Sequence, residues 1–96
     1  MENHEKLLRR KSRATSEKLD VHGLRVEDML IRVDKYLDDA VLGGLHRVRI
    51  VHGFGSGKLQ KAVWSFLKTH PEVESFDFAE SREGGAGATV VRLRSF

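Results

Sequence analysis

Apolar residues recur every three or four positions between residues 26 and 41, which is the spacing of one face of an α-helix. Glu27 and Asp28 fall in the first turn, where negative charge suits the helix dipole. Gly43 and Gly44 follow and favour termination. The pattern predicts a long amphipathic helix with this buried stripe: Val26, Met29, Leu30, Val33, Leu37, Ala40 and Val41.

A second helical period runs from Lys58 to Thr69, and Pro71 blocks its continuation. Trp64 falls outside the apolar stripe, which favours a place at the rim of the core over a role as a stacking platform. The stripe itself comprises Leu59, Ala62, Val63, Phe66 and Leu67.

Shorter segments alternate apolar and polar residues, which is typical of strands with one buried face. In the first of them, Leu19 and Val21 are expected to face the core, while Asp20 and His22 share the opposite face. The predicted strands are residues 19–23, 47–51, 73–79 and 88–93.

The order strand, helix, strand, helix, strand, strand predicts an α/β (α+β) two-layer sandwich with a four-stranded mixed sheet. Two helices are too few to cover both faces of the sheet, so both are expected on one face. The first two strands should be parallel, and the last should be antiparallel because only a short loop precedes it. The open face is expected to carry Arg47, Arg49, Arg92 and Arg94.

Composition narrows the class of protein. The 96 residues suffice for one domain with a modest core. Cysteine is absent, which excludes disulfides and thiolate metal sites and suits a reducing cytoplasm. No apolar run approaches the roughly 20 residues of a membrane span, and no signal peptide is visible, so no membrane partner is expected.

The formal net charge of +3 lies entirely on residues 1–18, which hold six basic and three acidic groups. This segment lacks an apolar period and is predicted to be a flexible arm. It is interpreted either as the end of a linker from a longer protein or as an arm that binds nucleic acid. The folded domain is expected to occupy residues 19–96.

The second strand leads into a glycine-rich turn that contains Gly53, Gly55 and Gly57, with Lys58 behind it. Glycine allows positive φ and a close approach to the backbone. A helix N-terminus favours anions, and a cation in its first turn is easier to explain if it meets a phosphate. The pattern favours contact with phosphate or nucleic acid over a turn that simply needs glycine.

His22-Gly23 and His52-Gly53 end the first two predicted strands. Open α/β sheets bind ligands at the carboxyl ends of parallel strands, so topology should bring Asp20, His22 and His52 to one edge. The spacing matches neither a Walker phosphate loop nor the G-x-G-x-x-G dinucleotide fingerprint.

The stretches Leu19–Gly23 and His52–Gly55 resemble the LDLHG and HGxG motifs of the Smr (small MutS-related) domain, with Val21 in place of the commoner leucine. The tail from Gly84 to Val91 is similar to the version that ends the second bacterial MutS paralogue. The resemblance spans about residues 19–94. It implies a fold like the C-terminal domain of translation initiation factor three, with upstream regions supplying the ATPase and oligomerisation.

The resemblance also implies a function in suppression of recombination or DNA repair, through nicking endonuclease activity on DNA, with branched DNA as one expected form of the substrate. The alternative is a non-cleaving module that binds RNA or a ribosome, in ribosome rescue or quality control. The sequence leaves both open, because histidine contacts phosphate as readily as it moves protons.

Candidate residues follow from these motifs. Asp20, His22 and His52 are the candidate catalytic residues, with His52 as general acid or base. Asp20 orients His22, holds a divalent ion such as Mg²⁺, or merely caps the strand end. The acidic face with Asp34, Asp38 and Asp39 is interpreted as solvated surface. The expected nucleic-acid contacts are Gly23, Arg25, Gly53, Gly55, Gly57, Lys58, Arg92 and Arg94.

Overall fold

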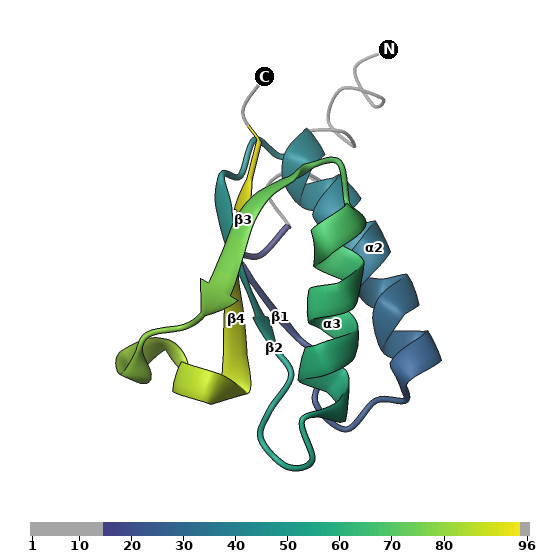
Figure 1. Ribbon diagram of the computed structural model, residues 1–96. Coiled ribbons are helices and arrows are strands. Elements are labelled where there is room, and N and C mark those ends of the chain that lie inside the picture. The colour runs from purple at the N-terminus through teal and green to yellow at the C-terminus, as the bar shows by residue number, and fades with distance from the viewer. Residues whose placement is uncertain (1–14, 95–96) are drawn as a thin grey trace.

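A computed structural model describes residues 15–94 of the chain. Figure 1 shows two layers, a sheet and a pair of helices packed against one of its faces. The predicted charged arm falls largely on residues 1–14, which lie outside the described part. The elements in order are β1 (Lys18–Asp20), α2 (Val26–Leu42), β2 (Arg47–Val51), α3 (Lys58–Thr69), β3 (Val73–Phe78), η1 (Ser81–Glu83), η2 (Gly85–Gly87) and β4 (Ala88–Leu93).

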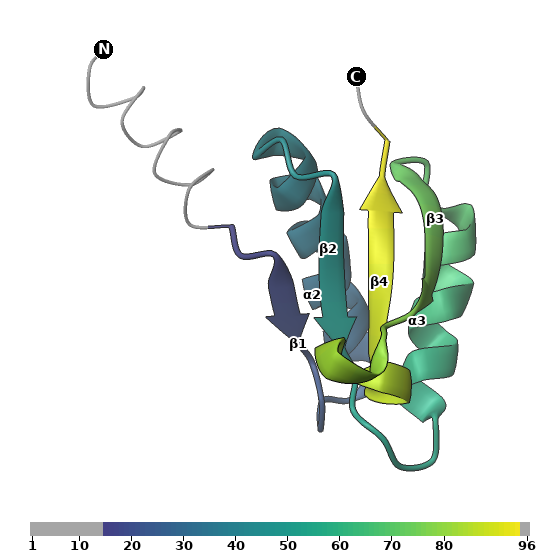
Figure 2. The same ribbon diagram turned by 90° about the vertical axis from the view of Figure 1, so that its left-hand side faces the viewer.

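The four-stranded mixed sheet has the order β1-β2-β4-β3. β1 pairs with β2 in parallel, with Asp20 opposite Val51. β4 is antiparallel to both β2 and β3. β1 and β2 therefore end at the same edge of the sheet, as Figure 2 shows at its lower end. The predicted fold class, the mixed sheet and the antiparallel last strand are confirmed.

The core lies between the sheet and the two helices. Fully buried side chains from α2 and α3, among them Met29, Leu37 and Val63, meet Ile50 and Val91 from the central strands. Burial of each such aliphatic side chain stabilises the fold by about 1.5–3 kcal/mol relative to an exposed one. This packing fixes both helices on one face, as the alternating strands predicted.

Two aromatic side chains outside the predicted apolar stripes contact the core or its edge. Tyr36 lies outside the predicted stripe of α2 but is buried, and its hydroxyl donates to the Ser16 carbonyl at 2.6 Å. Trp64 is half-buried and packs on Phe76 and Phe78 of β3, with ring centroids 5.1 and 4.7 Å away. Trp64 thus lies at the rim of the core, as predicted, where it packs against β3.

The open face of the sheet is partly covered by the 3₁₀ turns that precede β4. Arg47 donates to the Glu83 carboxylate at 2.7 Å, and Arg49 donates to the Glu83 backbone carbonyl at 2.8 Å. These bonds hold the Arg47 and Arg49 side chains on the face that alternation predicted. In the described part, neither helix combines the length and the apolar character that a membrane span requires.

Candidate functional site

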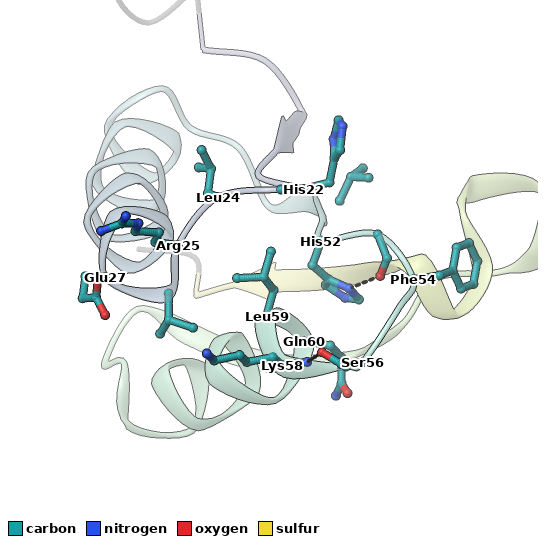
Figure 3. Close-up of a pocket in the computed structure, with 15 residues that line it drawn as sticks. His22, Leu24, Arg25, Glu27, His52, Phe54, Ser56, Lys58, Leu59 and Gln60 are labelled. Carbon is teal, nitrogen blue, oxygen red and sulfur yellow. Dashed lines mark hydrogen bonds between the residues drawn. The ribbon is translucent and has the colours of Figure 1, made fainter.

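A hollow of about 950 Å³ lies at the edge where β1 and β2 end. It is bordered by residues 22–27, which follow β1 and begin α2, and by residues 51–54 and 56–60, which lead from β2 into α3. Figure 3 shows the side chains of His22 and Lys58 on opposite sides of it. The structure thus brings the two His-Gly motifs and the glycine-rich turn together, as the topology predicted.

The N-termini of both helices border this hollow. The residues before the first turns are Arg25 for α2 and Gly57 for α3, and neither supplies a side-chain cap. The Ser56 hydroxyl accepts the Lys58 backbone N–H at 3.3 Å. At α3 this bond satisfies the first amide of the helix. The other first-turn amides and the aligned helix dipoles favour an anion. For α2 the sequence already contains a signal of this feature, because Arg25 stands at the N-cap position in place of a Ser, Thr, Asp or Asn.

The glycines of the loop adopt backbone conformations that other residues avoid. Gly53, Gly55 and Gly57 have φ values of +79°, +111° and +81°. A Cβ atom on Gly53 would also lie 3.2 Å from the Cβ of His22. The predicted positive φ at Gly53 and Gly55 is confirmed, and the contact explains why the two motifs fit together.

Asp20 and His22 form an exposed pair at the rim of the hollow. The His22 ring Nδ1 lies 2.5 Å from Asp20 Oδ1, and the same oxygen accepts the His22 backbone N–H at 3.0 Å. The two side chains are 47% and 69% exposed, respectively. These hydrogen bonds lower the pKa of the Asp20 carboxyl. Since a carboxylate only accepts, Nδ1 carries the proton and Nε2 is left as an acceptor.

His52 has a different environment, because the residue is only 3% exposed. Its Nδ1 lies 3.1 Å from the Gly53 carbonyl oxygen and its Nε2 lies 2.8 Å from Thr89 Oγ1. Burial lowers the pKa of His52, which favours the neutral ring. The carbonyl can only accept, so the proton sits on Nδ1 and Thr89 donates to Nε2.

Thr89 links His52 to a third side chain. The Trp64 indole Nε1–H donates to Thr89 Oγ1 at 2.9 Å. A chain of hydrogen bonds therefore runs from Trp64 through Thr89 and His52 to the Gly53 carbonyl. No local pattern signals this chain, because its members come from α3, β4 and the end of β2.

The predicted basic contacts fall into two groups. Lys58 and Arg25 border the hollow. Arg92 pairs with Arg47 at the start of β2, whereas Ala88 pairs with Val51 at its end. Arg92 and Arg94 therefore lie toward the opposite end of the sheet, and the Arg94 Nε–H donates to the Pro71 carbonyl at 2.9 Å. The structure does not bring these two arginines together with Lys58.

The donor set around Asp20 does not fit a protein-held divalent ion. Mg²⁺ is usually bound through one or two carboxylates together with phosphate oxygens and waters. Asp20 Oδ1 already accepts two hydrogen bonds from His22, and within residues 15–94 no group of three or more potential ligand residues includes Asp20.

Asp34, Asp38 and His70 do have potential ligand atoms within 4.8 Å of one another, on the far part of the helical layer. His70 Nδ1, however, accepts the Glu72 backbone N–H at 3.1 Å. The neutral ring then carries its proton on Nε2, the nitrogen that faces Asp34 at 3.8 Å. This arrangement suits a donor to the carboxylate and not a metal ligand.

Known proteins resemble this chain closely. A family model described as the Smr domain matches residues 19–94. An endonuclease MutS2 of Geobacillus kaustophilus is 57% identical over 76 residues, which are 79% of this chain and 10% of that protein. An endonuclease MutS2 of Symbiobacterium thermophilum is 52% identical over 84 residues, or 88% of this chain and 11% of that protein. The chain thus spans about a tenth of the length of these curated relatives.

Solved structures of Smr proteins have the same fold as this chain. The Smr domain of Thermus thermophilus MutS2 superposes with a TM-score of 0.80 at 42% identity, covering 82% of this chain and 99% of that one. YdaL, a stand-alone small MutS-related protein from Escherichia coli, gives a TM-score of 0.79 at 27% identity, over 82% of this chain and 65% of that one. By sequence and by fold, the chain belongs to the Smr domain family.

Proposed function

We propose that the hollow binds the phosphodiester backbone of a nucleic acid and that the domain cleaves it there. The observation that carries the proposal is the convergence on one hollow of two helix N-termini whose N-cap residues supply no side-chain cap, beside the glycine loop and Lys58. Each feature attracts an anion through backbone N–H groups or positive charge, and together they suit a polyanionic strand.

The exposed pair at the rim carries the proton transfer. Asp20 holds the proton of His22 on Nδ1, so that Nε2 is free to accept one from water. The water oxygen then bonds to phosphorus, the bond from phosphorus to the leaving oxygen breaks, and that oxygen takes a proton from the His22 imidazolium. Lys58 and the loop amides stabilise the charge that develops on the non-bridging oxygens.

In this proposal His52 positions the loop and does not move protons. Both of its ring nitrogens are engaged, and the residue is buried. Its bond to the Gly53 carbonyl orients the peptide that leads into the glycines. The sequence-based expectation that His52 acts as general acid or base stays a prediction, and replacing His22 and His52 separately distinguishes the two assignments.

Two relatives bear the name endonuclease, which supports cleavage, although this chain matches only about a tenth of each. We therefore propose, for this chain, that the substrate is DNA, including branched DNA. We also propose a role in recombination or repair. The alternative is a non-cleaving module that binds RNA or a ribosome. It is favoured by the burial of His52, which leaves His22 as the one exposed histidine that borders the hollow among residues 15–94.

Nicking of supercoiled plasmid by this chain, with and without a chelator, tests the proposal. His22→Gln should slow nicking about 10²- to 10⁴-fold, the usual contribution of a general acid–base group. Asp20→Asn should also slow it, while affinity stays within a few-fold. Asp38→Asn is the matched control, since it neutralises an exposed carboxylate on α2 outside the hollow.

One result would contradict the proposed proton transfer, and another would separate binding from cleavage. If folded His22→Gln and Asp20→Asn nick as fast as the parent, the assignment of the proton transfer to this pair is wrong. If the parent binds RNA or DNA through Lys58 but nicks neither, the binding site stands and the alternative of a non-cleaving module replaces cleavage.

A further inference from the structure

Phe54, at the tip of the glycine loop, is 80% exposed. Other aromatic residues near this edge are less accessible: Trp64 packs against Phe76 and Phe78 in the layer between α3 and β3. A phenyl ring exposed to this extent contributes little to the stability of the fold, because it removes little apolar surface from water. Its exposure beside a site that attracts anions therefore calls for a partner.

The ring is held in place despite its exposure. A Cβ atom on Gly87 would lie 2.8 Å from Phe54 Cε2, so only glycine lets the ring lie against this part of the backbone. The Gly87 carbonyl in turn accepts the backbone N–H groups of His52 and Gly53, at 3.1 and 2.8 Å. Figure 3 shows the ring directed away from the hollow, toward the turn before β4. A platform fixed in this way loses little freedom when it binds.

The chemistry around Phe54 identifies its partner. The adjacent hollow contains Lys58, Arg25 and two helix N-termini, which favour phosphates and disfavour a purely apolar protein surface. A flat aromatic ring next to a phosphate site is the arrangement that proteins use to stack bases of single strands. We infer that Phe54 stacks on an unpaired base of the strand whose phosphates occupy the hollow, an inference that rests on the proposed function.

The stacking role defines a substrate class. Bases inside a duplex are already stacked and paired, and exposing one requires both interactions to be broken. Phe54 therefore favours nucleic acid with unpaired nucleotides, either a single strand or the unpaired part of a branched molecule. The contact reads a base face and no hydrogen-bonding edge, so it accepts every base and both DNA and RNA.

Fluorescence anisotropy in the presence of a chelator measures this preference without cleavage. The probes are a labelled single-stranded DNA, the RNA of the same sequence, the blunt DNA duplex, and a single strand with abasic sites. Phe54→Ala should weaken single-strand binding about 5- to 150-fold, the range for loss of one stacked base. Phe54→Trp should retain it. Ile31→Ala, which removes a 70% exposed apolar side chain from α2, is the matched control.

Three further results are expected, and their opposites overturn the inference. Phe54→Ala should leave binding to the duplex and to the abasic strand nearly unchanged, because neither offers a free base. It should leave the slope of log affinity against log salt unchanged, because no charge is lost. Equal losses on all probes would make Phe54 a structural part of the loop, and no loss on the single strand would assign the ring to another partner.

The outcomes also separate this inference from the proposed function. If Phe54→Ala loses no single-strand affinity while the parent nicks plasmid in a His22-dependent manner, only the stacking role fails. If the parent nicks no substrate but prefers single strands through Phe54, only cleavage fails. If the parent binds no nucleic acid at all, both fail together.

Discussion

The hydroxyl of Thr89 lies 2.8 Å from Nε2 of His52, and this bond joins the end of β2 to the start of β4. Both residues are buried. His52 also contacts the Gly53 carbonyl, so the bond ties the glycine loop to the two central strands of the sheet. The conformation of the loop thus depends on a side chain that lies far away in the sequence.

Thr89→Val should destabilise the domain although it preserves shape. It removes the hydrogen-bond partner of one donor, the part-buried Trp64 Nε1–H, and of one acceptor, the buried His52 Nε2. Each unpaired group costs about 1–3 kcal/mol. Thermal or urea unfolding measures the loss. Thr89→Ser should cost less because it keeps the hydroxyl, and Thr69→Val, at an exposed hydroxyl of α3, is the control. Equal stability of Thr89→Val and the parent would contradict this role.

His52 should make stability depend on pH. Burial lowers its pKa in the folded state below the ordinary value of 6.5, so the unfolded chain binds the extra proton first as pH falls. The contribution of His52 to the free energy of unfolding is therefore full above about pH 6.5 and declines below it, toward the lower folded-state pKa.

Unfolding of the parent and of His52→Gln between about pH 5 and 7.5 checks this sign. The stability of the parent should fall more steeply toward the acid end than that of the variant. The other histidines are present in both proteins, so the difference between the two curves isolates His52. Parallel curves would show that His52 does not contribute to the pH dependence.

Gly55→Ala should reduce binding more than it reduces stability. Gly55 and Gly44 both have positive φ, +111° and +75°, and a Cβ atom on either would meet no atom within 4 Å. Alanine at either position should cost about 1–2 kcal/mol of backbone strain. Gly44 ends α2 outside the hollow, so Gly44→Ala should bind nucleic acid normally. If both variants bind equally well, the loop is only a turn.

The salt dependence of binding should locate the phosphate contacts. Lys58→Ala should flatten the slope of log affinity against log salt by about 0.7 to 0.9. Lys68→Ala, in the last turn of the same helix, is the control and should change it little. Arg94→Ala should also leave the slope unchanged, because Arg94 lies at the other end of β4 and bonds Pro71. An effect of Arg94 equal to that of Lys58 would support the wider surface that the sequence predicted.

The sequence by itself determined the elements and the class of fold. Both helices occupy the segments predicted by their three- and four-residue periods, and β2 and β4 have the predicted bounds. Local patterns suffice here, because an element buries the face that its own periodicity makes apolar. The strand that carries Asp20 is shorter than predicted, because His22 and Gly23 already belong to the turn toward α2.

The sequence also identified the edge of the sheet that forms the site, because parallel strands joined by a helix must end on the same side. His22-Gly23 and His52-Gly53 meet there as two equivalent motifs. In the tertiary structure the two histidines have different environments. His22 is exposed and oriented by Asp20, whereas His52 is buried against Thr89.

Only the tertiary structure decided what each charged or titratable group faces. Arg92 and Lys58 are both basic and both predicted to contact phosphate, yet antiparallel pairing of β4 with β2 carries Arg92 toward the far end of the sheet. His52 is likewise buried through its contact with Thr89 of β4. The position of the Phe54 ring is set by its contact with Gly87. Such contacts join residues more than 30 positions apart, and no local periodicity encodes them, because they arise only when the packed layers bring distant segments together.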